Sequence, residues 1–210
     1  VERGNVGGVV KSIKEKIKKE ITLPEGYYVV YGGEYENQEK AFRSLSLAVI
    51  FAVFLVFILI YITLGSISVT LLIMITLPAA LAGGIIAMFI TGTSLNVPSS
   101  IGFIALMGIA VQNSLVLFTN IKEMKEHGII GREAIIKASV DRVRPKLMTA
   151  LCAILGLIPL VVTKLQGTEM QKPMAIVIIG GLFTSTVFVL FILPVFYDMF
   201  LKFREGVIKI

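Results

Sequence analysis

Apolar residues occur along this chain in long uninterrupted runs, not in the short alternating patterns of a water-soluble domain. The 78 residues from 44 to 121 contain no Asp, Glu, Lys, Arg or His. A transmembrane helix needs about 20 mostly apolar residues to cross the hydrocarbon core of a bilayer, so this run has room for three crossings. Two further uncharged runs, residues 147–163 and 173–197, add two more. The pattern predicts a mainly α-helical bundle of five transmembrane helices.

Turn and cap residues indicate where the five helices begin and end. Gly65 with Ser66 allows a tight connection between the first two helices, and Pro98 is suited to the start of the third. Pro145 suits the first turn of the fourth helix, because its missing N–H has no partner there. Within a membrane domain of residues 44–210, the predicted helices cover approximately residues 45–64, 67–90, 101–121, 146–164 and 173–200.

Residues 1–43 are polar enough to lie in water. Apolar residues recur at three- and four-residue spacing over residues 6–21, which predicts an amphipathic helix, and residues 27–31 form a β-prone run. One helix and one strand bury too little apolar surface to fold alone. We therefore expect a small N-terminal α+β piece, completed by sequence upstream of Val1.

Basic residues cluster at the ends of the apolar runs. Residues 122–146 carry seven Lys and Arg, and the positive-inside rule places this segment and the C-terminus in the cytoplasm, with residues 1–43 outside. Within it, residues 131–144 are amphipathic and are predicted to lie along the membrane surface. The net charge of +6 does not indicate nucleic acid binding, because these cations do not line one groove-sized face. The expected surroundings are instead a lipid bilayer.

Polar residues at membrane depth are the first candidates for function, because unpaired ones are costly there. Gln112 and Asn113 lie near the middle of the third crossing, where they either face a proton or ion path or join helices by hydrogen bonds. Lys146, close to Arg144, either exchanges charge with a carboxylate on another helix or marks the membrane boundary. Thr149 either extends this polar path or donates back to its own helix.

Acidic residues are missing from the depth of all five predicted crossings, and Asp198 lies close to the end of the fifth. Proton relays in membrane transporters usually use Asp, Glu or His inside the membrane. We therefore expect any proton-carrying acid to lie on helices outside this chain.

The pattern of glycine, methionine and cysteine residues favours helix packing over ligand binding. Glycine pairs in the second and fifth crossings favour close helix packing over a substrate-binding kink: Gly83, Gly84, Gly180 and Gly181. Eight methionines, among them Met170 and Met174, fit core filling better than a soft-metal site. Cys152 and His127 are the only residues of their types, so no metal site or cofactor is expected. Without a phosphate loop, nucleophile elbow or paired carboxylates, no enzyme is indicated.

Several strings resemble a known family. They are GGEYENQEKA (residues 32–41), GFIALMGIAVQN (102–113), RVRPKLMTA (142–150), MQKPMAIVIIGGL (170–182) and LPVFY (193–197). In this order they resemble the C-terminal end of resistance-nodulation-division (RND) efflux pumps. The GGEYENQ and QKPMA strings resemble the heavy-metal branch, exporters of cobalt, zinc and cadmium or of copper and silver.

The resemblance implies a larger parent protein. The five crossings are then the last five of twelve, and residues 1–43 close a periplasmic porter subdomain. The parent is implied to be a proton-driven homotrimer of the inner membrane, docked to a periplasmic adaptor and an outer-membrane channel. Gln112 departs from the family pattern. At the matching position, the resemblance implies a lysine in multidrug pumps and a glutamate in copper pumps. Lys146 and Thr149 are then the stronger candidates for relay neighbours.

These observations predict a fragment of a proton-driven exporter of heavy-metal cations. One alternative is a multidrug or other-solute exporter of the same family, or a related membrane protein that exports lipid or protein. Another is a truncated membrane remnant that transports nothing.

Overall fold

The computed structural model describes residues 13, 16, 17, 34–163, 168 and 170–208. Contacts divide the chain into two compact units, Val1–Ala48 and Val49–Ile210. In the first unit, Ile13, Lys16 and Ile17 are helical. The remainder of the predicted helix at residues 6–21 and the strand at 27–31 lie outside the described residues. The part that is described contains helices and no strand, so the α+β prediction has no support from it.

Five stretches of helix within the described residues are long and apolar enough to span a membrane, as predicted. The first is formed by α2 (Glu34–Leu64) and the second by α3 (Ile67–Met74) with α4 (Thr76–Thr91). The third and fourth are α5 (Val97–Glu126) and α6 (Arg132–Val162). The fifth combines α7 (Gln171–Val187), the π-helical turn η1 (Phe188–Ile192) and α8 (Leu193–Ile208).

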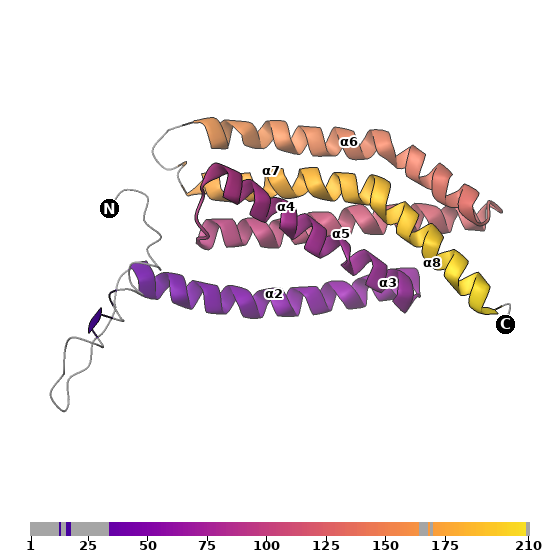
Figure 1. Ribbon diagram of the computed structural model, residues 1–210, viewed down its shortest axis with the longest axis horizontal. Coiled ribbons are helices and arrows are strands. Elements are labelled where there is room, and N and C mark those ends of the chain that lie inside the picture. Colours follow the sequence, from indigo (N-terminus) through magenta and orange to yellow (C-terminus); the bar gives the residue numbers. More distant parts are fainter. Residues whose placement is uncertain (1–12, 14–15, 18–33, 164–167, 169, 209–210) are drawn as a thin grey trace, which may run out of the picture. The chain divides into compact units, whose positions relative to one another are not determined.

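Helix α7 forms the centre of the second unit, where it packs against α4, α5 and α6 (Figure 1). Two clusters of buried apolar side chains fill this bundle, one around Leu106 and Val177 and the other around Ile73, Leu117 and Leu193. By contrast, the most apolar stretch of α6 is only 6% buried, although Ala134, Ile135 and Ala138 near its start are covered. In a membrane protein such faces lie against lipid or further helices.

The glycine pairs lie where helices approach most closely. A Cβ atom added at Gly180 would lie 2.6 Å from the carbonyl oxygen of Gly83, and one added at Gly83 would lie 2.7 Å from the carbonyl oxygen of Gly180. Their neighbours contact the third span, since Gly84 meets Phe103 and Gly181 meets Leu106. Backbones this close leave no room for larger side chains between α4 and α7.

Helix α6 differs from the sequence expectation. It runs continuously from Arg132 to Val162 and contains Pro145 in its interior, whereas we expected a surface helix to end at residue 144 and a crossing to begin at 146. Proline removes one backbone hydrogen bond without ending a helix whose other groups remain paired, and transmembrane helices tolerate it for this reason. Residues 132–144 of the expected surface helix are therefore joined to the fourth span as one helix.

Two other spans contain irregularities that were not predicted, each shortly before a proline, Pro78 in the second span and Pro194 in the fifth. The second span breaks at Ile75, between α3 and α4, where the Thr76 hydroxyl donates to the Ile73 carbonyl at 2.7 Å. The fifth span widens into a π-helical turn at Phe188–Ile192. Turns of this kind inside α-helices are frequent at functional sites.

Candidate functional site

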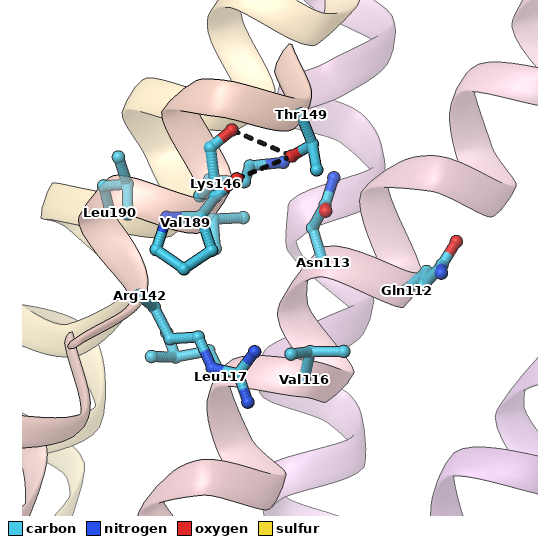
Figure 2. A pocket seen from close by; sticks show the side chains of 10 residues that line it. Gln112, Asn113, Val116, Leu117, Arg142, Lys146, Thr149, Val189 and Leu190 are labelled. Atoms are coloured by element: carbon cyan, nitrogen blue, oxygen red, sulfur yellow. Dashed lines mark hydrogen bonds between the residues drawn. The ribbon is translucent and has the colours of Figure 1, made fainter. Parts of the chain in front are cut away.

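The four polar residues singled out from the sequence line one cavity of about 190 Å³. Gln112 and Asn113 come from α5, whereas Lys146 and Thr149 come from α6 (Figure 2). The π-helical turn η1 supplies an apolar wall through Val189 and Leu190. The rest of the lining consists of Val116, Leu117, Arg142 and Pro145.

Lys146 is the buried charge of this cavity. Its side chain is only 8% exposed, and its ammonium makes no hydrogen bond or ion pair with any residue that the structure describes. A charged lysine in the membrane interior costs about 3 kcal/mol or more unless it is paired or hydrated. The cavity supplies room for water, but among its lining residues there is no Asp or Glu.

Asn113 and Gln112 face different ways although they are adjacent in the chain. The Asn113 amide points across the cavity toward Lys146 and Thr149, whereas the Gln112 amide points away from α6 (Figure 2). Neither side chain is hydrogen-bonded to another residue within the described part of the chain, so the pair does not join these helices. Asn113 is therefore the member of the pair that can exchange hydrogen bonds with the contents of the cavity.

The Thr149 hydroxyl donates back to its own helix. Its Oγ1 lies 3.1 Å from the carbonyl oxygen of Pro145 and 3.0 Å from that of Lys146. This is the self-bonding arrangement considered from the sequence. The oxygen retains lone pairs, so it can still accept a hydrogen bond from water or from an ammonium group in the cavity.

Arg142 lines the cavity and was missed from the sequence, where Arg144 was paired with Lys146 instead. In a continuous helix, residues four apart share a face and residues two apart do not. Arg142 therefore points with Lys146 toward α5, and Arg144 is exposed. The spacing of four was visible in the sequence, but the expected break at Pro145 concealed it.

Two polar contacts between helices were also missed. The Ser114 hydroxyl on α5 donates to the Thr76 hydroxyl on α4 at 3.2 Å, next to the break at Ile75. The Asn120 amide on α5 donates to the Ala138 carbonyl oxygen on α6 at 3.3 Å. Both donors are buried, and they fix α5 against α4 within the stretch that lines the cavity and against α6 just beyond it.

The sulfur residues and the histidine lie apart from this cavity. Met170 is 71% exposed, Met174 packs against Gly102, and Cys152 is an exposed free thiol. His127 caps the C-terminal end of α5. Among the described residues no three His, Cys, Asp or Glu side chains gather in a way that could hold a metal ion.

The model of the AcrB/AcrD/AcrF family matches residues 1–201 of the chain. The chain belongs to this family. The resemblance to RND efflux pumps is thereby confirmed, because the matched range includes every string on which it was based.

Curated relatives place the chain near metal-resistance members of the AcrB/AcrD/AcrF family. It is 38% identical to the nickel and cobalt resistance protein CnrA of Cupriavidus metallidurans over 202 residues, 96% of the chain and 19% of the relative. It is 39% identical to the nickel-cobalt-cadmium resistance protein NccA of Alcaligenes xylosoxydans xylosoxydans over 205 residues, 98% of the chain and 19% of the relative. The chain thus spans about a fifth of the length of these relatives.

A solved structure agrees with the sequence relatives. The crystal structure of a heavy metal efflux pump superimposes with a TM-score of 0.79 at 34% identity, covering 92% of the chain and 19% of the pump. The five apolar helices of this chain thus have the arrangement of one part of that pump. The names of these proteins describe resistance and efflux, not catalysis.

Proposed function

We propose that this chain is the C-terminal membrane segment of a proton-driven RND transporter that exports heavy-metal cations. Its support is the match to the family, the names of the metal-resistance relatives and the cavity around Lys146. The observation that carries the proton-coupling part is the burial of Lys146 without an acidic partner among the described residues.

The proposed relay is a charge exchange between this cavity and acids on helices outside the chain. An ionised carboxylate that enters the cavity pairs with the Lys146 ammonium, and Arg142 supplies a second positive charge. Protonation of the carboxylate removes this attraction and leaves the two cations to repel each other. Helices α5 and α6 then move relative to the helix that carries the acid, which links proton uptake to a change in helix packing.

The metal cation follows a different route in this proposal. The described residues include no metal-ligating cluster, so the ligands belong to other parts of the parent protein. Residues 1–43 complete a periplasmic porter subdomain, and the connection between α5 and α6 and the C-terminus face the cytoplasm. The parent acts as a homotrimer with an adaptor and an outer-membrane channel, as the family resemblance implies.

The proposal is tested by replacing Lys146 in the full-length protein that carries this segment. Lys146→Met keeps the length of the side chain and removes its charge. The variant is expressed in cells that lack their own metal exporters. We expect these cells to be no more resistant to nickel, cobalt, zinc or cadmium than cells with the empty vector, although the amount of protein in the membrane is unchanged.

Lys137→Met is the matched control, because Lys137 is exposed on the same helix and lies outside the cavity. We expect it to leave resistance intact. Full resistance in the Lys146→Met strain would remove Lys146 from the mechanism. Equal losses in both strains would show that general charge on α6, not the cavity, is responsible.

A second candidate is an exporter of another solute. The chain is 32% identical to the swarming motility protein SwrC of Bacillus subtilis over 206 residues, 98% of the chain and 20% of the relative. That name does not refer to metal. A deletion strain that keeps its metal resistance but becomes sensitive to amphiphilic organic compounds would favour this candidate.

A further inference from the structure

A second cavity, of about 260 Å³, lies near the ends of α2 and α5 and the start of α3, against residues 197–201 of α8. Its walls are apolar on the side of α2 and α8, through Leu64, Phe200 and Leu201. Two lysines of α5, Lys122 and Lys125, border it. It therefore combines an apolar wall with two positive charges at the level where the uncharged run of α5 stops.

Lys125 is held in this cavity by an aromatic pair. Its ammonium donates to the Tyr197 hydroxyl at 3.0 Å and lies 5.3 Å from the centre of the same ring. Tyr197 is 6% exposed and packs edge-on against Phe118, with ring centres 5.0 Å apart. The lysine is thus fixed beside the apolar wall and does not extend freely into water.

No carboxylate neutralises these two cations within the described residues. Asp198 follows Tyr197 directly, but it pairs with Lys202 at 3.0 Å. The Tyr197 hydroxyl accepts its hydrogen bond from Lys125, so its own proton is free to donate to a further oxygen atom. The site thus offers two ammonium groups and one hydroxyl donor to an anion.

We propose that this cavity binds an anionic phospholipid. The phosphate contacts Lys122, Lys125 and the Tyr197 hydroxyl, and an acyl chain lies along Leu64 and Leu201. Basic pockets between transmembrane helices at the membrane surface are suited to anionic headgroups. A soluble anion would leave the apolar wall in contact with water, and an apolar helix from the parent protein would leave both lysines unpaired.

The binding experiment compares phosphatidylglycerol with phosphatidylcholine on the purified full-length protein, by native mass spectrometry in detergent. Each lysine near a membrane surface contributes about 1 kcal/mol of attraction to anionic lipid, so removing two corresponds to about 30-fold in affinity. We expect the Lys122→Ala/Lys125→Ala variant to bind phosphatidylglycerol about 30-fold more weakly, with unchanged binding of phosphatidylcholine. Tyr197→Phe, which keeps the ring, should weaken phosphatidylglycerol binding about 5-fold.

Lys137→Ala/Lys172→Ala is the matched control, because it removes the same charge from exposed positions outside the cavity. We expect it to bind phosphatidylglycerol like the unaltered protein. Equal losses in the two double variants, or no loss in either, would overturn the proposal. Displacement of the lipid by millimolar inorganic phosphate would also overturn it, because the site would then recognise a soluble anion.

A photoactivatable amino acid in place of Val69, which also lines the cavity, identifies the occupant directly. After irradiation in phosphatidylglycerol vesicles, we expect an adduct with the mass of the lipid. An adduct with another segment of the parent protein would show that protein, not lipid, fills the cavity.

Discussion

Lys146 and Arg142 lie four residues apart on the face of α6 that borders α5, and the cavity between the helices contains no acid of this chain. Two cations at membrane depth are stable together only if carboxylates or water compensate them. The same arrangement makes the cavity responsive to protonation of any carboxylate that enters it. At the scale of single residues, this imbalance of charge is the feature that the proposed function depends on.

The glycine pair between α4 and α7 provides a second test at this scale. Gly180→Ala places a Cβ atom 2.6 Å from the Gly83 carbonyl oxygen, so the two helices must separate. Overpacking of this kind typically costs about 1–3 kcal/mol. We expect a lower melting temperature of the full-length protein in detergent, measured by scanning fluorimetry.

Gly156→Ala is the control for this prediction, because a Cβ atom there meets nothing within 4 Å and alanine favours the helix. Its melting temperature should be unchanged or higher. Melting of Gly180→Ala at the temperature of the unaltered protein would show that α4 and α7 are not packed through these glycines.

Single residues were predictable from the sequence where polarity alone identified them. Asn113 and Thr149 stood out because they lie within apolar runs and Lys146 because it borders one, and all three line the cavity. The direction of the Gln112 amide, away from α6, could not be predicted, because it depends on the rotation of α5 about its axis. Arg142 was missed because proline was taken as a boundary.

Among the helices, α6 allows a direct test, because one continuous helix and a separate surface helix that turns near Pro145 predict different distances along it. Spin labels at Lys137 and Leu155, both exposed and both on α6, are 18 residues apart. A continuous helix separates their Cα atoms by about 27 Å, whereas a surface helix that turns at a right angle near Pro145 brings them to about 19 Å.

Pulsed electron paramagnetic resonance on the full-length protein measures the distance between the two labels. We expect the longer value, about 27 Å. A main population at the shorter value would restore the separate surface helix and remove Arg142 from the cavity.

The number of membrane spans was predictable, because it follows from the length of the runs without charged residues. The uncharged runs indicated five spans, and the described residues contain five helices of suitable length. The break at Ile75 and the π-helical turn at Phe188–Ile192 were not predicted, although a proline follows each of them closely, Pro78 after the break and Pro194 after the turn. A proline inside a helix cannot donate to the carbonyl four residues earlier, so each irregularity has a local cause that a reading of span lengths alone overlooked.

At the scale of the whole molecule, the chain is about a fifth of the relatives it matches. Its central helix α7 is well covered, whereas the apolar face of α6 is largely uncovered. A full-length pump can bury these faces with further helices and with lipid. One proposal thus explains two observations, that the cavity around Lys146 has no acidic lining residue and that the apolar face of α6 is uncovered. In this proposal, helices outside this chain complete the bundle.

Proton coupling through Lys146 is tested by metal-dependent proton movement in vesicles that contain the purified full-length protein. A pH gradient is imposed across the membrane, and its collapse on addition of nickel or cobalt is followed with a pH-sensitive dye. We expect rapid collapse with the unaltered protein and with Lys137→Met, and no collapse above the protein-free rate with Lys146→Met, because proton movement depends on the Lys146 charge. Metal-dependent collapse at the full rate in Lys146→Met would contradict this dependence.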